Sequence, residues 1–140
     1  MDRKEIIITT EKQFTRLNDY LNDFIKDKKG AGLLHVFTTH TTCAIKIIEG
    51  EILLLADINN FLDTLIPKEN NYMHDRIEIR DVPVNERINA HSHLRQLFLP
   101  TSESIPVQDG KMMLGKWQSV YLVELDPIRD RNVIFTYIGE

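Results

Sequence analysis

The sequence predicts an α+β fold with a mixed, mostly antiparallel sheet and about three helices. Apolar residues at helical spacing are concentrated in the first part of the chain, whereas the last third is a series of short β-rich runs. The Asp109-Gly110 pair lies between two of these runs. Such a pair favours a two-residue hairpin, because both turn residues adopt positive φ angles.

The N-terminal region predicts one strand followed by one helix. Residues 4–8 are rich in β-branched side chains and are expected to form a strand. Thr10 and Gln13 have the spacing of a capping box, which predicts that a helix begins there. Apolar residues recur at helical spacing from position 14 to position 25, and three lysines precede Gly30. The helix is therefore expected to end just before this glycine.

The middle of the chain predicts two strands and two helices. Residues 33–39 and 43–48 are short β-rich runs, and residues 52–66 have an apolar stripe that Pro67 ends. We expect a loop at 70–74, a short strand at 76–82, and a third helix at 85–99 that ends before Pro100. The remaining strands are expected at residues 104–107, 111–114, 117–125 and 132–138.

Length and composition indicate one domain spanning residues 1–140. The chain has 42% hydrophobic and 27% charged residues, values that are typical of a globular domain. The net charge is −4 and the basic residues are scattered, so we expect no nucleic-acid partner. No apolar run approaches the ~20 residues of a membrane span. A single cysteine, Cys43, favours a reducing compartment, and the protein is expected to be soluble and cytoplasmic.

Five histidines could supply a metal site, because neutral imidazole binds zinc and similar ions. A histidine taken alone is more often a surface or hydrogen-bonded residue, and that alternative stays open; His35 is interpreted as a strand residue. Two helical positions that are two residues apart point roughly 200° away from each other. At most one of His91 and His93 should therefore face a given pocket.

Several other polar residues have two interpretations each. Glu49 and Asp57 could act as a general base, a metal ligand or a partner that orients a histidine, but Glu49 could equally favour the start of the second helix. The threonines around His40 could bind phosphate or simply favour strand geometry. On a straight strand, His40 and Glu49 would be about 30 Å apart. A shared pocket would therefore need a bend, a loop or a second subunit.

Several segments, in fixed order, resemble the YjbQ-like family, also known as secondary thiamine-phosphate synthase enzymes. They are HTTCAIKIIEGE, HDRIEIRDVP, NAHSHL, IPVQDGKMMLGKWQSVYLVELD and RDRNVIF. The resemblance implies a YjbQ-like α+β fold with a β-sandwich-like core. It also implies a homotrimer with a pocket at or near the subunit contact.

The resemblance also implies site residues and an activity. The implied metal ligands are His40, His74 and His93; the implied catalytic residues are Glu49, Asp57 and Arg131; the implied substrate-binding residues are Thr41, Trp117, Gln118 and Arg131. The expected cofactor is a divalent metal ion, zinc or similar, with magnesium possible for a pyrophosphate substrate. The expected function is a metal-assisted enzyme on a small phosphorylated or anionic substrate, with a thiamine-phosphate synthase side activity. The alternative is a non-catalytic module that binds a metal or ligand.

Overall fold

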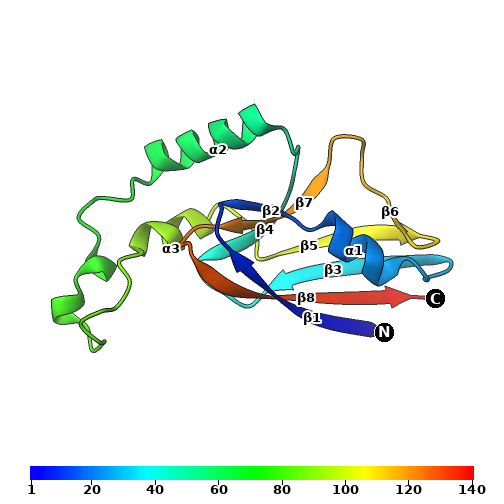
Figure 1. The fold of residues 1–140 in the computed structure, drawn as a ribbon, viewed down its shortest axis with the longest axis horizontal. Coiled ribbons are helices and arrows are strands. Elements are labelled where there is room, and N and C mark those ends of the chain that lie inside the picture. Colours follow the sequence, from blue (N-terminus) through cyan, green and yellow to red (C-terminus); the bar gives the residue numbers. More distant parts are fainter.

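Two antiparallel sheets form the centre of the molecule in the computed structural model, which describes residues 1–140 (Figure 1). The larger sheet has the order β1-β8-β3-β5-β6 and comprises β1 (Asp2–Thr10), β8 (Arg129–Gly139), β3 (Ala31–Thr38), β5 (Ser102–Gln108) and β6 (Lys111–Met112). The smaller sheet has the order β2-β7-β4 and comprises β2 (Phe14–Arg16), β7 (Ser119–Glu124) and β4 (Cys43–Ile48). The predicted α+β class with a mostly antiparallel sheet is confirmed.

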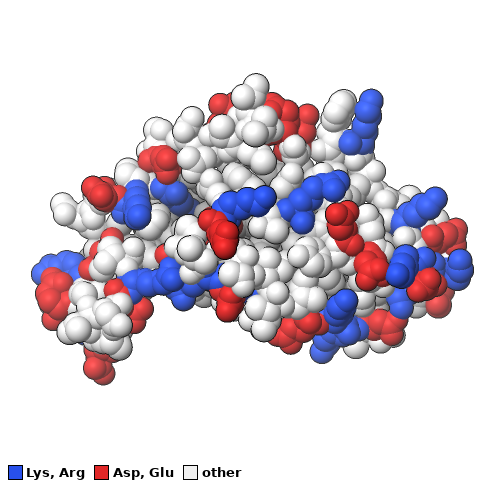
Figure 2. All heavy atoms as spheres, in the orientation of Figure 1, with Lys and Arg blue, Asp and Glu red and all other residues white.

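The chain has three α-helices and two short 3-10 helices. The α-helices are α1 (Asn18–Ile25), α2 (Ile52–Leu65) and α3 (Ala90–Gln96), and the 3-10 helices are η1 (Met73–Asp75) and η2 (Ile77–Ile79). None of these helices has both the length and the apolar character needed to cross a membrane. Figure 2 shows that Lys and Arg are interspersed with Asp and Glu over the displayed face.

The main core lies between the two sheets, because alternate residues of each strand point to opposite faces. Val120 and Leu122 of β7 are fully or almost fully buried against residues of the larger sheet, together with Leu21 and Ile25 of α1. Tyr121 and Val123 point the other way and pack with Leu62 of α2 in a second, smaller cluster. Helix α2 therefore lies on the outer side of the three-stranded sheet and packs on it mainly through Leu62 (Figure 1).

The predicted capping box at Thr10 is wrong. Thr10 is the last residue of β1, and its buried hydroxyl donates to the carboxylate of Glu124 instead of capping a helix. The next residues form β2, which pairs with β7, and the helix begins only at Asn18. Pairing with β7 gives these backbone groups tertiary partners, and this pairing outweighs the local helical pattern.

The predictions for the middle of the chain are right except around the third helix. Strand β4 matches the predicted residues 43–48, and α2 ends one residue before the predicted boundary. No strand forms at 76–82, where η2 lies instead. Helix α3 is shorter than predicted because Arg87 donates to the carbonyls of Asp126 and Ile128, and the Asp75 carboxylate accepts from the Ala90 amide.

The predicted hairpin at Asp109-Gly110 is confirmed. These residues have φ angles of 48° and 74°, and Gln108 pairs with Lys111 across the turn. Strand β7 begins two residues later than predicted, so residues 117 and 118 precede it. Strand β8 begins three residues earlier than predicted, and the extension brings Arg129 and Arg131 into the sheet.

Candidate functional site

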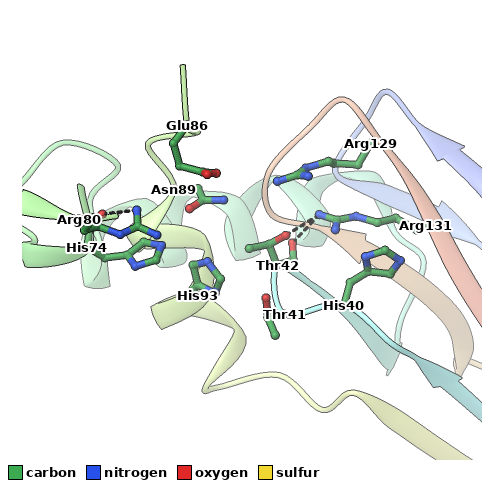
Figure 3. Close-up of a pocket in the computed structure, with 10 residues that line it drawn as sticks. All are labelled: His40, Thr41, Thr42, His74, Arg80, Glu86, Asn89, His93, Arg129 and Arg131. Atoms are coloured by element: carbon green, nitrogen blue, oxygen red, sulfur yellow. Dashed lines mark hydrogen bonds between the residues drawn. The ribbon is translucent and has the colours of Figure 1, made fainter. Parts of the chain in front are cut away.

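One end of the sandwich holds a polar pocket of about 300 Å³ that has no hydrophobic lining residue (Figure 3). We call it the arginine pocket, and its lining residues are His40, Thr41, Thr42, His74, Arg80, Glu86, Asn89, His93, Arg129 and Arg131. These residues come from the β3–β4 connection, the segment from η1 to α3, and the start of β8. The pocket therefore lies where three distant parts of the sequence meet.

Five of the site residues expected from the sequence gather in this pocket: His40, Thr41, His74, His93 and Arg131. Figure 3 shows the imidazoles of His74 and His93 close together, whereas His40 lies beside Arg131. His91 is buried and is absent from the lining of the pocket, so the two histidines of α3 point in different directions. Its Nδ1 atom has no hydrogen-bond partner.

The other expected site residues lie elsewhere in the single chain. Glu49 and Trp117 line a separate cavity, and Asp57 is exposed on α2. The Gln118 side chain accepts from the Gly115 amide in the turn before β7. Glu51, and not Glu49, caps α2, because its side chain accepts from the Leu53 amide. The structure therefore does not place His40 and Glu49 in one pocket of the same chain.

Arg131 is held in place by a buried ion pair. Its side chain lies between the two sheets with an exposure of 2%, and its Nε and Nη2 atoms donate to the two carboxylate oxygens of Glu124 at 2.7 and 2.5 Å. Nη2 also donates to the carbonyl and hydroxyl oxygens of Thr42. Nη1 makes no hydrogen bond within the chain. One amino group of Arg131 thus stays available beside the pocket.

The Glu124 carboxylate is fully engaged and ionised. Burial alone would raise its pKa, but hydrogen bonds from Arg131, Thr10 and the Asp126 amide outweigh burial and hold the pKa below its usual value. Glu124 lies in β7 on the face that points to the larger sheet. The Glu124 carboxylate therefore neutralises the positive charge of Arg131 from outside the pocket lining.

Two further arginines contribute to the pocket. Arg129 donates to Asp126 at 3.0 Å, and its buried Nε has no hydrogen-bond partner. Arg80 donates to the carbonyl oxygen of His74 at 2.9 Å. The one carboxylate among the lining residues belongs to Glu86. Glu124 and Asp126 pair with Arg131 and Arg129 from outside the lining, so the wall itself presents three guanidinium groups to a ligand. Such a wall is suited to an anion.

His74 and His93 form a pair whose ring centroids are 4.8 Å apart, with an edge-to-face angle of 75°. Asp75 brings them together, because its carboxylate accepts from the Ala90 amide at 2.9 Å and so joins η1 to the start of α3. Burial lowers the pKa of His93, and the neighbouring His74 and Arg80 lower it further. The neutral form of His93 is therefore favoured near neutral pH.

His40 is fixed by two backbone contacts. Its Nε2 atom accepts a hydrogen bond from the Asn132 amide at 3.0 Å, which assigns the ring proton to Nδ1. The Gln96 side chain donates to the carbonyls of both His40 and Cys43 at 2.8 Å. Gln96 lies in the last turn of α3 and thereby joins the wall that carries His93 to the wall that carries His40.

A family model described as UPF0047 protein YjbQ-like matches residues 4–140 of the chain. The chain belongs to this family. A UPF0047 protein of Archaeoglobus fulgidus is 42% identical over 103 residues, which cover 74% of this chain and 75% of that protein. A UPF0047 protein of Methanothermobacter thermautotrophicus is 39% identical over 109 residues, which cover 78% and 70%. The resemblance seen in the sequence is confirmed.

Solved structures of this YjbQ-like family have the same fold. A hypothetical protein from Aeropyrum pernix K1 superposes with a TM-score of 0.87 at 31% identity, and the match covers both chains completely. A YbjQ-like protein of unknown function from Sulfolobus solfataricus P2 gives a TM-score of 0.86 at 27% identity, with coverage of 99% of this chain and 97% of that one. The expected YjbQ-like fold is therefore confirmed.

The implied three-histidine metal set does not converge in the single YjbQ-like chain. No group of three or more His, Cys, Asp and Glu side chains has the arrangement of a metal site. The nitrogen of His40 that accepts from Asn132 is already occupied. Only His74 and His93 are adjacent as potential ligands.

The sequence interpretation missed five residues of the site and its support: Arg80, Glu86, Asn89, Glu124 and Arg129. Arg129 had a readable signal, because it is two residues before Arg131 and therefore lies on the same face of an extended strand. Glu124 also had one, since it is a lone charge inside an apolar run, and such a charge needs a partner when buried. The segment with Arg80 and Glu86 has no periodic pattern from which its position could be predicted.

Proposed function

We propose that this protein is a metal-assisted enzyme that binds a small phosphorylated substrate in the arginine pocket. The observation that carries the proposal is the presence of Arg80, Arg129 and Arg131 around a pocket without hydrophobic lining. Nη1 of Arg131 has no hydrogen-bond partner within the chain. Guanidinium groups bind phosphate oxygens through forked, charge-assisted hydrogen bonds, so the three arginines favour a phosphate.

The histidines bind the metal ion and contact the substrate in this proposal. The neutral form of His93 is favoured by burial and by its positive neighbours, and neutral imidazole is the form that coordinates a divalent ion. His40 carries its ring proton on Nδ1, because Nε2 accepts from Asn132. That proton is available to donate to an anionic oxygen of the substrate.

A divalent metal ion is the cofactor that we propose, with His74 and His93 as its protein ligands. The donor set fits an ion in part, because the two imidazoles are adjacent and neutral imidazole binds zinc-like ions. Oxygen atoms of the substrate or of water would complete the coordination. When bound, the ion would add positive charge where a phosphate group departs. In this proposal His40 contacts the substrate rather than the ion.

The thiamine-phosphate synthase side activity is the candidate reaction that follows from the family resemblance. It joins a pyrimidine pyrophosphate to a thiazole phosphate and releases pyrophosphate. Such a substitution needs positive charge near the departing group, and three arginines line the arginine pocket. We propose this reaction as a side activity, and the physiological substrate as another small phosphorylated or anionic molecule.

Phosphate binding can be tested by isothermal titration of the purified protein with inorganic phosphate and pyrophosphate. Arg80→Met and Arg129→Met should each weaken binding by about tenfold or more, because a hydrogen bond to a charged group contributes roughly 1.5–3 kcal/mol. Arg3→Met on β1 is the matched control, since Arg3 is exposed and absent from the pocket. Equal binding by all four proteins would refute the proposal.

Turnover distinguishes the enzyme from the alternative, a non-catalytic module that binds a metal or ligand. The protein is incubated with the pyrimidine pyrophosphate and the thiazole phosphate, and products are followed by mass spectrometry, with elemental analysis of the same preparation. An enzyme should release pyrophosphate, and His93→Ala should abolish the release. Tight phosphate binding without turnover of these or other phosphorylated heterocycles would favour the module.

We propose that the protein assembles as a homotrimer and works in the cytoplasm. Apolar side chains that would need cover are exposed on the outward face of the larger sheet, among them Ile7, Leu33 and Ile138. Leu33 and Ile138 are direct neighbours across β3 and β8. Light scattering coupled to gel filtration should give three times the mass of one chain, and Leu33→Lys should reduce it. The single buried Cys43 supports a reducing compartment.

A further inference from the structure

We propose that a second, apolar compartment beside the arginine pocket binds the organic part of the same phosphorylated substrate. The proposal rests on the proposed function, because it assigns the phosphate to the arginine pocket. It adds the class of the substrate: a phosphate or pyrophosphate ester of a small, uncharged, apolar or aromatic group.

The apolar compartment is a separate cavity of about 420 Å³. Its lining residues are Asn71, Tyr72, Met73, His74, Ala90, His93 and Leu94. Two of them, His74 and His93, also line the arginine pocket. The imidazole pair therefore stands between the two cavities, and one molecule that passes this pair would contact both.

The two cavities differ sharply in chemistry. The arginine pocket has three arginines and no hydrophobic residue, whereas the apolar compartment has four hydrophobic residues among seven and no Lys, Arg, Asp or Glu. A charged group would lose its hydration in the apolar compartment without gaining a partner. An apolar group would gain nothing in the arginine pocket. The contrast fits a ligand with one anionic and one uncharged end.

The walls of the apolar compartment are fixed by hydrogen bonds outside it. The hydroxyl of Tyr72 donates to the Pro67 carbonyl at 2.7 Å, which holds the phenol ring. Ala90 and Leu94 are four residues apart on α3 and therefore lie on one face of the helix. The bond from the Ala90 amide to Asp75 holds that helix face against η1. These contacts do not depend on a ligand.

The position of the imidazole pair indicates which part of the substrate it contacts. The phosphate would lie on the arginine side and the organic group on the other side, so His74 and His93 would lie beside the bond that joins them. Small-molecule sites have volumes of roughly 300–1,000 Å³, and the two cavities together fall in this range. The combined site suits a metabolite-sized ester.

The test compares methyl phosphate with benzyl phosphate by isothermal titration of the full chain. Wild-type protein should bind benzyl phosphate about tenfold tighter, because the ring removes apolar surface from water. Leu94→Gln and, as a second variant, Met73→Gln should remove most of this difference and leave the affinity for methyl phosphate unchanged. Leu97→Gln is the matched control, since Leu97 is exposed at the end of α3 and lies outside both cavities. Thermal melting establishes that each variant is folded.

Each outcome separates this inference from the proposed function. A preference for benzyl phosphate that Leu94→Gln loses and Leu97→Gln keeps supports the apolar compartment. The apolar compartment is overturned if wild-type protein binds the two esters equally well, or if the Leu94 and Leu97 variants lose the preference for benzyl phosphate equally. Phosphate binding in the arginine pocket would stand in both cases. If neither methyl phosphate, benzyl phosphate nor inorganic phosphate binds, the proposed function itself is overturned.

Discussion

Glu124 and Arg131 form a bidentate ion pair between the two sheets, at the end of an otherwise apolar core. Both side chains are almost completely buried, with exposures of 0% and 2%. Both carboxylate oxygens of Glu124 accept hydrogen bonds from Arg131, and one amino group of the arginine remains beside the arginine pocket. Glu124 is thus a positioning residue: it acts through Arg131 and does not itself line the pocket.

Glu124→Gln should destabilise the fold and weaken phosphate binding together. The amide cannot accept from both nitrogens of Arg131, and the guanidinium charge is left without its buried partner. Removing one member of a buried ion pair costs about 3–5 kcal/mol. Urea denaturation measures the loss in the free energy of unfolding. Glu69→Gln, at an exposed position after α2, is the control and should change this free energy little.

The same carboxylate predicts how stability depends on pH. The pKa of Glu124 is lower in the folded chain than in the unfolded chain, so the unfolded state binds more protons as the pH falls. Stability from Glu124 is therefore present above its unfolded pKa of about 4.3 and is lost as the pH falls through the folded pKa. Melting temperatures measured between pH 7 and pH 3 should fall less steeply in Glu124→Gln. If the melting temperatures of the two proteins fall in parallel with pH, Glu124 is not a source of the pH dependence.

Asp75→Ala should separate His74 from His93. The carboxylate is the acceptor for the Ala90 amide, and loss of such a cap costs about 1 kcal/mol. Zinc binding measured by isothermal titration should weaken, and Asp75→Asn should restore part of it because the amide oxygen can still accept. Asp81→Ala changes an exposed carboxylate of the same segment and serves as the control. Similar binding by the two alanine variants would mean that Asp75 does not position the imidazole pair.

Gly110→Ala should destabilise the protein more than Gly30→Ala. Both glycines have positive φ, 74° and 71°, so the backbone strain of about 1–2 kcal/mol is common to the two changes. An added Cβ at Gly110 would lie 2.7 Å from the carbonyl oxygen of Lys26, whereas at Gly30 its closest contact is a flexible side chain at 3.6 Å. The difference in melting temperature between the two variants measures the cost of the close contact between the hairpin and the end of α1. Equal melting temperatures would show that the backbone there can move.

Local patterns in the sequence predict the elements whose signals are local. The Asp109-Gly110 hairpin depends on two turn residues, and α2 depends on its own apolar spacing, so both were predictable. The start of α1 was not, because β2 forms by pairing with β7, which lies about 100 residues away in the chain. The length of α3 likewise depends on Arg87 and its carbonyl partners in the turn after β7.

The candidate site was predictable in part for the same reason. The family motifs placed His40, His74, His93 and Arg131 among the site residues, and the structure gathers all four. The motifs give order along the chain and not distance in space, so Glu49, Trp117 and Asp57 could not be separated from them. Arg80 and Asn89 depend on how an irregular segment folds against the turn between β7 and β8. Nothing in the residues nearby determines that path.

Gln96 sets the span between the two walls of the arginine pocket, since one side-chain amide contacts the carbonyls of His40 and Cys43 from the end of α3. A shorter asparagine at this position would not reach both carbonyls from the same helix. Relatives that differ here should therefore hold their imidazoles at a different separation from β8. Two family members with the same lining residues would then accept ligands of different size if they differ at position 96, which lies outside the pocket lining.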